Sequence, residues 1–260
     1  MTQSLLHYTR HGHGPRVVLL HPVGLDGTFW RDLPQRLSDH YTVICVDLRG
    51  HGGSSPAKRP GSMAACVADV AAVIKDAWQG QGHAKAVVLG LSFGGMVAQN
   101  LAITHPELVS GLVVCGCGAM VPPAFKQAIL ARGSDAEQGG MQAVTPATLE
   151  RWFTPAFMDS PEVEKVRARL LADDPSDFAA AWEAISEHAA LGQLKQVTVP
   201  ALVIGGSLDL ATSVEAITVL ADAFAHGQRV ILEGAPHMMQ IENQDVFYTA
   251  VRHFLDQMGQ

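Results

Sequence analysis

Charged residues are scarce in this chain, and basic ones are scarcer than acidic ones. Charged side chains make up 17% of the 260 residues, with 18 Lys and Arg against 25 Asp and Glu, for a formal net charge of −7. Nucleic-acid-binding proteins carry a basic patch or stripe, and anionic membrane surfaces attract basic segments. We therefore expect neither nucleic acid nor a membrane among the partners of this protein.

Long apolar runs are also missing. No uninterrupted run approaches the roughly 20 residues that span a bilayer. The first residues, Met1–His7, lack the basic start and long apolar stretch of a signal peptide. Hydrophobic residues nevertheless make up 48% of the chain, enough for one large core. The sequence thus predicts a cytoplasmic globular protein.

Cysteine is rare, and its spacing suggests no disulfide framework. Cys45 and Cys115 fall in expected strands, where free cysteine behaves as a small buried hydrophobe. The pair Cys115 and Cys117 has no further ligands near it in sequence, and the twelve histidines show no H-E-x-x-H spacing. No G-x-G-x-x-G follows a strand. We therefore expect no metal and no cofactor.

Apolar, β-branched segments alternate with segments of helical composition along most of the chain. Several apolar segments are almost continuously hydrophobic, which is typical of parallel strands covered by helices on both faces. This alternation predicts an α/β fold with a doubly wound, mostly parallel sheet. The expected strands are Arg16–His21, Tyr41–Asp47, Ala84–Leu89, Leu108–Cys115, Val199–Gly205 and Gln228–Leu232, and the expected helices are Met63–Trp78, Phe93–Thr104, Val214–Ala225 and Val246–Met258.

The alternation breaks in the middle of the chain. Residues 120–191 contain no convincing strand, and a loop of that length would be rare in a compact domain. We expect helices to start there at Pro146, Pro161 and Pro175, because the first turn of a helix tolerates the missing amide proton of proline. The sequence therefore predicts an inserted helical cap over this range. The core would consist of residues 1–119 and 192–260.

The pentapeptide Gly90-Leu91-Ser92-Phe93-Gly94 lies between an expected strand and an expected helix. G-x-S-x-G in that position is typical of a nucleophile elbow, a tight turn that holds its serine in a strained backbone conformation. Side chains at the flanking glycines would collide with the crossing strand and helix. Because a serine hydroxyl alone is a poor nucleophile, the turn needs a base, an orienting acid and an oxyanion site.

Two further residues meet this need in the order serine, acid, histidine. Asp209 and His237 each follow an expected strand, and the carboxyl ends of parallel strands line one crevice. We expect His237 to take the proton of Ser92 as the hydroxyl attacks a carbonyl, and to return it to the leaving group. Asp209 would orient the imidazole and stabilise the imidazolium.

A tetrahedral oxyanion needs preorganised donors, each worth about 3–4 kcal/mol. One donor is expected to be the backbone amide of Phe93, directly after the nucleophile. The other should come from the loop His21-Pro22-Val23-Gly24, which follows the first expected strand. Val23 is the better donor there, because Pro22 has no amide proton.

With these residues the chain resembles the α/β-hydrolases over essentially its whole length. The segments that carry the resemblance are His21–Gly24, Asp47–Ser54, the serine pentapeptide, Pro200–Gly205 and the loop before His237. One position differs, since many members have His-Gly where this chain has His21-Pro22. Within the superfamily, the cap segments 139–141 and 149–155 are similar to those of the 3-oxoadipate enol-lactonase group.

Other polar residues near the expected strand ends are given structural roles. Asp47 is an alternative acid, but the following Arg49-Gly50-His51-Gly52 resembles a structural loop of the superfamily, so we favour turn formation. His51 belongs to the same loop. His21 is expected to be a hydrogen-bonded structural histidine, and Asp26 a turn residue.

Substrate contacts are expected to come from the cap. The aromatic residues there could line an apolar pocket or form the core of the cap, and the sequence favours neither alternative: Trp152, Phe153, Phe157 and Trp182. A lactone that carries a carboxylate would need a nearby cation. Arg132 and Arg151 are candidates for that role, with His188 as a further one.

Together the residues predict cofactor-independent hydrolysis of an ester or lactone through an acyl-enzyme on Ser92. The resemblance implies an enol-lactone or related small lactone from the degradation of aromatic compounds. The alternatives are a short-chain carboxylesterase and a hydrolase of carbon–carbon bonds in ring-cleavage products. An alternative from another class is a noncatalytic small-molecule receptor on a hydrolase scaffold, although a pure binder has no chemical need for all three catalytic residues.

Overall fold

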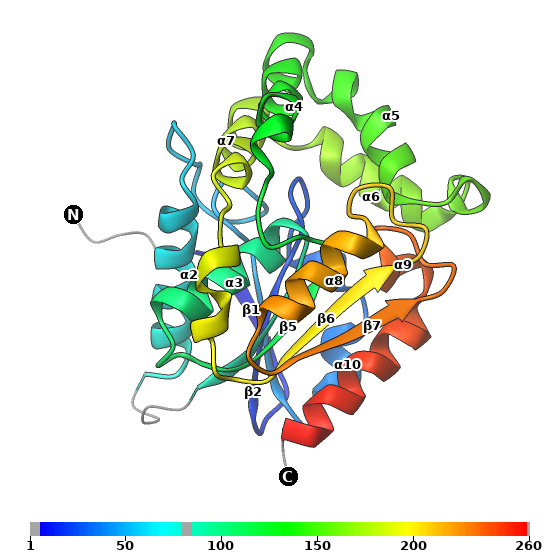
Figure 1. Ribbon diagram of the computed structural model, residues 1–260. Helices are drawn as coiled ribbons and strands as arrows, with labels where there is room; N and C mark the ends of the chain where they lie inside the picture. Colours follow the sequence, from blue (N-terminus) through cyan, green and yellow to red (C-terminus); the bar gives the residue numbers. More distant parts are fainter. Residues whose placement is uncertain (1–5, 80–84, 259–260) are drawn as a thin grey trace.

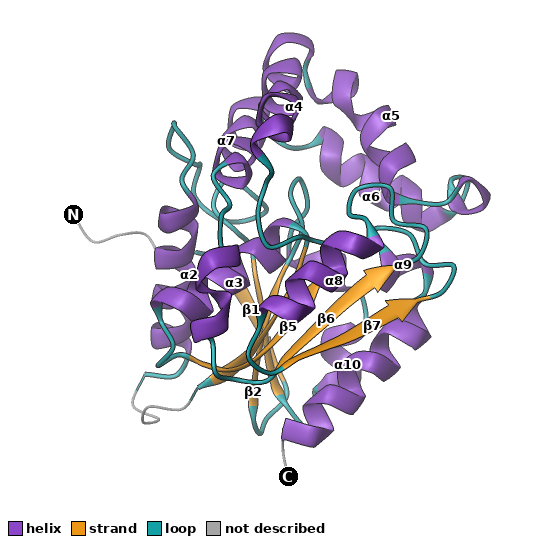
Figure 2. Cartoon of the chain, viewed as in Figure 1, coloured by secondary structure: helices purple, strands orange, loops and turns teal. Residues whose placement is uncertain are grey.

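The computed structural model describes residues 6–79 and 85–258. At its centre lies a seven-stranded sheet with the order β1-β3-β2-β4-β5-β6-β7, in which only the β1–β3 pair is antiparallel (Figure 1). Six strands therefore end at the same edge of the sheet, beneath the helices of the middle segment (Figure 2). The strands are β1 (Tyr8–His11), β2 (Arg16–Leu20), β3 (Thr42–Val46), β4 (Ala86–Leu91), β5 (Val109–Cys115), β6 (Ala201–Gly206) and β7 (Gly227–Leu232).

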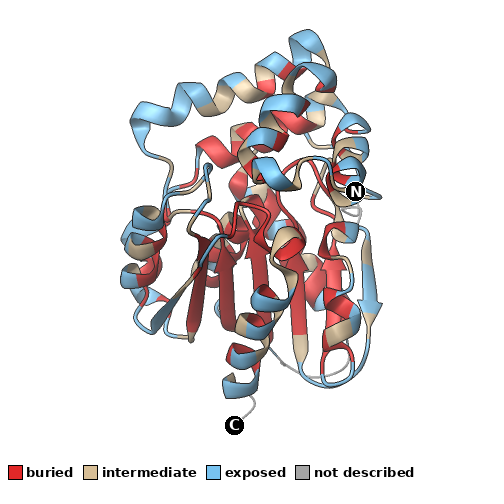
Figure 3. Ribbon diagram, turned by 90° about the vertical axis from the view of Figure 1, so that its right-hand side faces the viewer, coloured by how far each residue is buried: buried red, intermediate tan, exposed pale blue. Residues whose placement is uncertain are grey.

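The central strands are buried along nearly their whole length (Figure 3). Their apolar runs require this, because in a parallel sheet both faces are covered. The expected strand Ala84–Leu89 begins at a residue outside the described part of the chain. In the structure β4 ends at Leu91, so that the strand leads directly into Ser92.

The strand β1, at the edge of the sheet, is not among the strands expected from the sequence. Its four residues pair with β3 from Tyr8 opposite Val46 to His11 opposite Val43. The two middle residues are exposed and polar. A short edge strand of this kind has neither an apolar run nor a full alternation, so only its partner strand reveals it.

Helices cover both faces of the sheet, as the doubly wound fold requires. On one face α3 packs against β4 and β5 and beside α2, and α8 packs against β6. On the other face lie α1 and α10, where Tyr248 donates a hydrogen bond to the Arg36 carbonyl. The bounds are α1 (Leu33–Leu37), α2 (Met63–Ala77), α3 (Phe93–Thr104), α8 (Val214–Ala223), α9 (Met239–Glu242) and α10 (Gln244–Met258).

Between β5 and β6 the chain forms α4 (Lys126–Gly139), α5 (Met141–Trp152), α6 (Pro161–Leu171) and α7 (Pro175–Ser186). Residues 120–191, called the cap below, are all described and contain no strand; Met120 and Ala189 form an isolated antiparallel bridge. Where α4 packs on α7, a Cβ at Gly133 would lie 2.8 Å from the Ala179 Cα. Short 3-10 helices lie at η1 (Gly27–Trp30), η2 (Pro123–Phe125), η3 (Pro155–Phe157) and η4 (Leu191–Gln196).

Two of the three predicted proline helix starts are confirmed. Pro161 and Pro175 begin α6 and α7, each after a side chain that caps the helix, Ser160 and Asp174 respectively. The prediction for Pro146 was wrong, because this proline lies inside α5.

The helix α5 begins at Met141, directly after Gly140, whose φ is 74°. Pro146 removes an amide that would bond to the carbonyl of Gln142, a loss that helix interiors tolerate only when other contacts offset it. One residue earlier, the Thr145 hydroxyl donates to the Met141 carbonyl oxygen at 2.7 Å. A glycine junction, not the proline, therefore marks the start of this helix.

The four cysteines are free and buried. Cys45 in β3 and Cys115 in β5 pack as small apolar side chains, as predicted. Within residues 6–79 and 85–258, no helix is both long and apolar enough to cross a membrane. Residues 1–5, on which the expectation about the amino terminus partly rests, lie outside the described part of the chain.

Candidate active site

Ser92 lies in the turn between β4 and α3. Its backbone has φ 54° and ψ −115°, and a positive φ is uncommon for any residue with a side chain. A Cβ at Gly90 would lie 2.2 Å from the Gly94 carbonyl oxygen, and one at Gly94 would lie 2.1 Å from the Leu20 carbonyl oxygen. Close approach of the backbones thus requires both glycines, and Ser92 itself stays partly exposed.

Asp209 and His237 form a buried pair. His237 Nδ1 lies 2.9 Å from Asp209 Oδ2, and the two side chains are 2% and 0% exposed. The other carboxylate oxygen accepts the amides of Ala211 at 2.7 Å and Thr212 at 2.9 Å. With one oxygen held by the backbone and the other on Nδ1, the imidazole keeps its second nitrogen, Nε2, for other partners.

The serine turn and this pair meet at the end of β5. The Ser92 amide donates to the Cys115 carbonyl oxygen at 2.8 Å. A Cβ on the next residue, Gly116, would lie 3.3 Å from His237 and 3.6 Å from Asp209. The structure therefore brings together the three residues that the sequence predicted to converge, from the loops after β4, β6 and β7.

The loop after β2 lies beside the serine turn. A Cβ at Gly94 would lie 2.8 Å from the His21 carbonyl oxygen, two residues before Val23. Val23 and Phe93 are both buried. Within the described part of the chain, neither backbone amide donates a turn or loop hydrogen bond. The prediction that these two amides form the oxyanion site is therefore compatible with the described hydrogen bonds.

Two histidines of the core hold this loop in place by hydrogen bonds. His21 Nδ1 donates to the Pro22 carbonyl at 2.7 Å and its Nε2 accepts the Leu48 amide at 2.9 Å. His51 Nε2 accepts the Gly24 amide at 3.0 Å. Burial lowers the pKa of His21 to about 4 and that of His51 to about 3, so both stay neutral and keep these tautomers.

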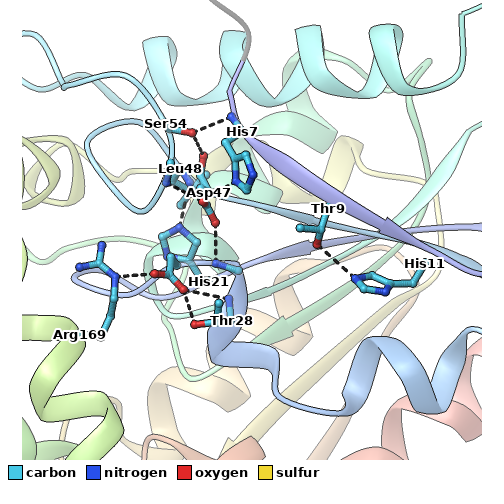
Figure 4. Close-up of polar contacts among 12 residues, drawn as sticks. His7, Thr9, His11, His21, Thr28, Asp47, Leu48, Ser54 and Arg169 are labelled. Atoms are coloured by element: carbon cyan, nitrogen blue, oxygen red, sulfur yellow. Dashed lines mark hydrogen bonds and ion pairs between the residues drawn. The ribbon is translucent and has the colours of Figure 1, made fainter.

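Asp47 also has a structural role, as predicted. Its carboxylate accepts the amides of Gly27 at 2.7 Å and Gly53 at 2.8 Å, and it lies 2.8 Å from His7 Nδ1 (Figure 4). These contacts tie the loop after β3 to the loop after β2, and they occupy both carboxylate oxygens.

From the cap, Trp152 stacks on His237. The ring centroids are 6.4 Å apart and the planes are 29° from parallel. The Met238 amide donates to the Trp152 carbonyl at 3.0 Å, and Thr154 donates to Glu242 in α9. This end of α5 is therefore fixed to the histidine loop, and it covers the imidazole.

Arg132 of α4 lies 4.7 Å above the ring of Trp182 in α7. Burial, and then the charge of Arg151, lower the pKa of Arg132 to about 10. Among the described residues, no acidic side chain pairs with either arginine, and the buried Trp182 Nε1 has no hydrogen-bond partner. The cap therefore holds two cations and an N–H donor without an acceptor.

A family model described as the alpha/beta hydrolase fold matches residues 15–244. The chain belongs to this family. 3-Oxoadipate enol-lactonase 2 of Acinetobacter baylyi is 32% identical over 250 residues, which cover 95% of this chain and 91% of the relative. The crystal structure of the enol-lactonase from Burkholderia xenovorans LB400 matches with a TM-score of 0.89 at 31% identity, over 96% of each chain.

A thermophilic esterase from Thermogutta terrifontis, solved with malate bound, matches this α/β hydrolase with a TM-score of 0.90 at 28% identity. That match covers 98% of this chain and 94% of the esterase. The expected α/β-hydrolase fold and the resemblance to the enol-lactonase group are thus confirmed. The protein is a hydrolase, and its substrate must be argued from the site.

The remaining cap candidate of this α/β hydrolase, His188, has both ring nitrogens engaged. Nδ1 lies 3.1 Å from the Asn100 side-chain amide and Nε2 lies 3.2 Å from the Gly118 carbonyl oxygen. Burial lowers the pKa of His188 to about 4. It fastens the base of the cap to α3, and we leave it out of the proposed substrate contacts.

Leu170 and Phe178 are two cap residues near the site that were not expected from the sequence. A Cβ at Gly24 would lie 2.6 Å from Leu170 Cδ2 and 3.1 Å from Phe178 Cε2, so α6 and α7 press directly on the loop that holds Val23. No local pattern distinguishes these side chains from ordinary cap core. No group of three or more metal-binding side chains occurs in the part of the chain that the structure describes.

Proposed function

We propose that this α/β hydrolase is a serine hydrolase that cleaves an ester or lactone carbonyl through an acyl-enzyme on Ser92. The observation that carries the proposal is the placement of a partly exposed serine with positive φ next to the buried Asp209–His237 pair. Strain of this kind is retained where a side chain must be presented for reaction.

The first half of the reaction forms the acyl-enzyme. Ser92 Oγ attacks the carbonyl carbon while His237 Nε2 takes its proton, and Asp209 stabilises the resulting imidazolium. The amides of Val23 and Phe93 hold the oxyanion. The bond to the leaving oxygen then breaks, and His237 returns the proton to that oxygen.

In the second half, water attacks the acyl-enzyme with His237 as base, and Ser92 leaves as the free hydroxyl. A lactone keeps its leaving hydroxyl tethered, so this water must react before the ring closes again. The stacking of Trp152 on His237 supports a covered site in which a small substrate is held in place.

The substrate we propose is a small lactone with a free carboxylate, of the enol-lactone type. Arg132 and Arg151 would bind the carboxylate, since an arginine that is partly buried without an acid gains most from an anionic partner. Two neighbouring tryptophans support this assignment. Arg151 directly precedes Trp152, which stacks on His237, and Arg132 lies over Trp182, which contacts Phe178 beside Gly24.

The test is turnover of 3-oxoadipate enol-lactone and of an aryl acetate by wild type, Ser92→Ala and Ser110→Ala. Ser110, at the amino end of β5, is the matched control. Ser92→Ala is expected to lower kcat/KM by at least about 10³-fold on both substrates, and Ser110→Ala to change it less than about 2-fold.

Ser92-dependent turnover of the lactone far above that of the aryl ester would support the lactonase. Ser92-dependent turnover of the aryl ester alone would favour a short-chain carboxylesterase; the Thermogutta terrifontis relative is named a thermophilic esterase. Activity that survives in Ser92→Ala would overturn the proposed mechanism. A wild type that binds the lactone without turning over either substrate would favour the receptor.

A further inference from the structure

A cavity of about 810 Å³ lies between the core and the cap, beside the loop that carries Val23. On the core side it is lined by residues that include Asp26 and Asp47, and on the cap side by Arg169 and Asp173. None of the three proposed catalytic residues lines it. The cavity therefore marks a separate junction, at which cap and core meet through charged groups.

Arg169 of α6 spans this junction (Figure 4). Its Nε donates to Asp26 Oδ2 at 2.5 Å, and its Nη2 lies 2.7 Å from Asp173 Oδ1 without hydrogen-bond geometry. Arg169 and Asp26 are 21% and 13% exposed. A charged hydrogen bond between partly buried groups is screened less by salt than one at the surface, and it is stronger.

Asp26 lies at the end of the loop 22–26, which carries Val23, and its side chain fixes that end. Its Oδ1 accepts both the amide and the hydroxyl of Thr28, at 2.9 and 2.5 Å, and so caps the 3-10 helix η1. Burial alone would raise the pKa of Asp26, but these bonds and the charge of Arg169 lower it. The carboxylate is thus held charged between η1 and α6, three residues after Val23.

Gly24, in the middle of the same loop, lies between the core and the cap. On the core side, His51 accepts the Gly24 amide. On the cap side, Leu170 and Phe178 leave no room for a side chain at Gly24. Leu170 directly follows Arg169 in α6. The residue that bonds to Asp26 and the residue that presses on Gly24 are therefore carried by one turn of one helix.

We propose that Arg169 is a positioning residue for the oxyanion site. Through Asp26 it fixes the loop 22–26, and so sets the Val23 amide at the distance from Ser92 that the oxyanion requires. The bond forms only when α6 packs in this position on the core, so the oxyanion site is complete only when the cap is in place. The inference rests on the proposed serine mechanism and adds a cap residue to it that touches no substrate.

The chain offers a matched control on the same helix. Glu162, also in α6, pairs with Arg31 at the end of η1, with Oε2 3.0 Å from Nε. This second ion pair also joins cap to core but lies beyond η1 from Val23. Glu162→Gln therefore weakens the attachment of α6 without releasing Asp26.

The experiment compares Arg169→Met, Asp26→Asn, the double variant and Glu162→Gln, each on the enol-lactone and on the aryl acetate. Arg169→Met is expected to lower kcat about 10- to 100-fold on both substrates with KM changed less than about 3-fold, because a displaced oxyanion donor acts on the transition state. Asp26→Asn should match it, the double variant should be no worse than either, and Glu162→Gln should stay within about 2-fold.

An aryl trifluoromethyl ketone provides the readout that a loss of stability alone would not move. Ser92 Oγ adds to its carbonyl carbon, the proton passes to His237, and the ketone oxygen becomes an anion in the oxyanion site. Its inhibition constant should rise in Arg169→Met in parallel with the fall in kcat, measured on protein that circular dichroism shows to be folded.

An unchanged inhibition constant, additive effects in the double variant, or an equal loss in Glu162→Gln would each overturn the positioning role. Failure of the serine mechanism is a distinct result, since it appears as activity or ketone inhibition that persists in Ser92→Ala. The Arg169 comparison is interpreted on the substrate for which Ser92 is required.

Discussion

At the scale of single residues, the sequence allowed candidates to be chosen where a rule ties chemistry to backbone position. Ser92 between two glycines, and Asp209 and His237 each after a strand, could be chosen because strand ends of a parallel sheet share one edge. The arginines of functional interest, Arg132, Arg151 and Arg169, could not be ranked in this way. Among the residues that the structure describes, Arg132 has no acidic partner and Arg169 has two, and only the fold decides which acids lie nearby.

Because no described acidic side chain pairs with Arg132, a residue-scale prediction follows for a carboxylate substrate. Arg132→Gln is expected to raise KM for the enol-lactone about 10- to 100-fold, the range for a lost charge-assisted hydrogen bond, while KM for the uncharged aryl acetate changes less than about 2-fold. Arg167→Gln is the control, because Arg167 pairs only with Glu164 of its own helix in the described structure. Equal KM changes on the two substrates would contradict a carboxylate site at Arg132.

At the scale of elements, the apolar strands and the long helices could be predicted because their periodicity is local. The strand β1 escaped prediction because its pairing with β3, not its own composition, makes it a strand. The prediction of a helix start at Pro146 was wrong because a proline is compatible with a helix start but does not require one. In the structure α5 begins five residues earlier. Local rules thus located elements well and their exact starts less well.

The N-terminal capping residue of helix α7, Asp174, allows an element-scale prediction. Asp174 accepts the amides of Ser176 at 2.8 Å and Asp177 at 3.3 Å, which otherwise lack helical partners. Asp174→Ala is expected to lower the free energy of unfolding by about 1 kcal/mol, and Asp174→Asn to restore most of it. Urea denaturation followed by circular dichroism measures both, and a wild-type midpoint in Asp174→Ala would show that this cap contributes nothing.

At the scale of the whole molecule, the fold class and the insertion of a helical segment follow from the order of elements. The way in which the cap packs on the core does not. Contacts such as Arg169 with Asp26 and Phe178 with Gly24 join distant parts of the chain, and no sequence pattern in one part predicts its partner in the other. The same contacts bury several titratable groups, and this burial makes the stability of the whole molecule depend on pH.

Burial holds three histidines neutral, with pKa values lowered to about 4 for His21, about 3 for His51 and about 4 for His188. In the unfolded chain each would take up a proton near pH 6.5. Their contribution to stability is therefore complete above that pH and is lost as the pH falls toward 4. Asp173 acts in the opposite sense, because burial raises its pKa to about 7 and the folded state then binds the proton more tightly.

The three histidines, which lose stability on acidification, outweigh Asp173, which gains it. We expect the free energy of unfolding to fall by about 3 kcal/mol between pH 7.5 and 5, as measured by urea denaturation at fixed ionic strength. Asp173→Asn removes the opposing group and should make the fall steeper by about 2 kcal/mol, whereas His188→Gln should make it shallower by a similar amount. A stability that is constant or rising toward pH 5 would mean that these histidines are already protonated in the folded protein. A protonated Nε2 cannot accept a hydrogen bond, so the bonds from backbone amides to Nε2 of His21 and His51 would then be contradicted.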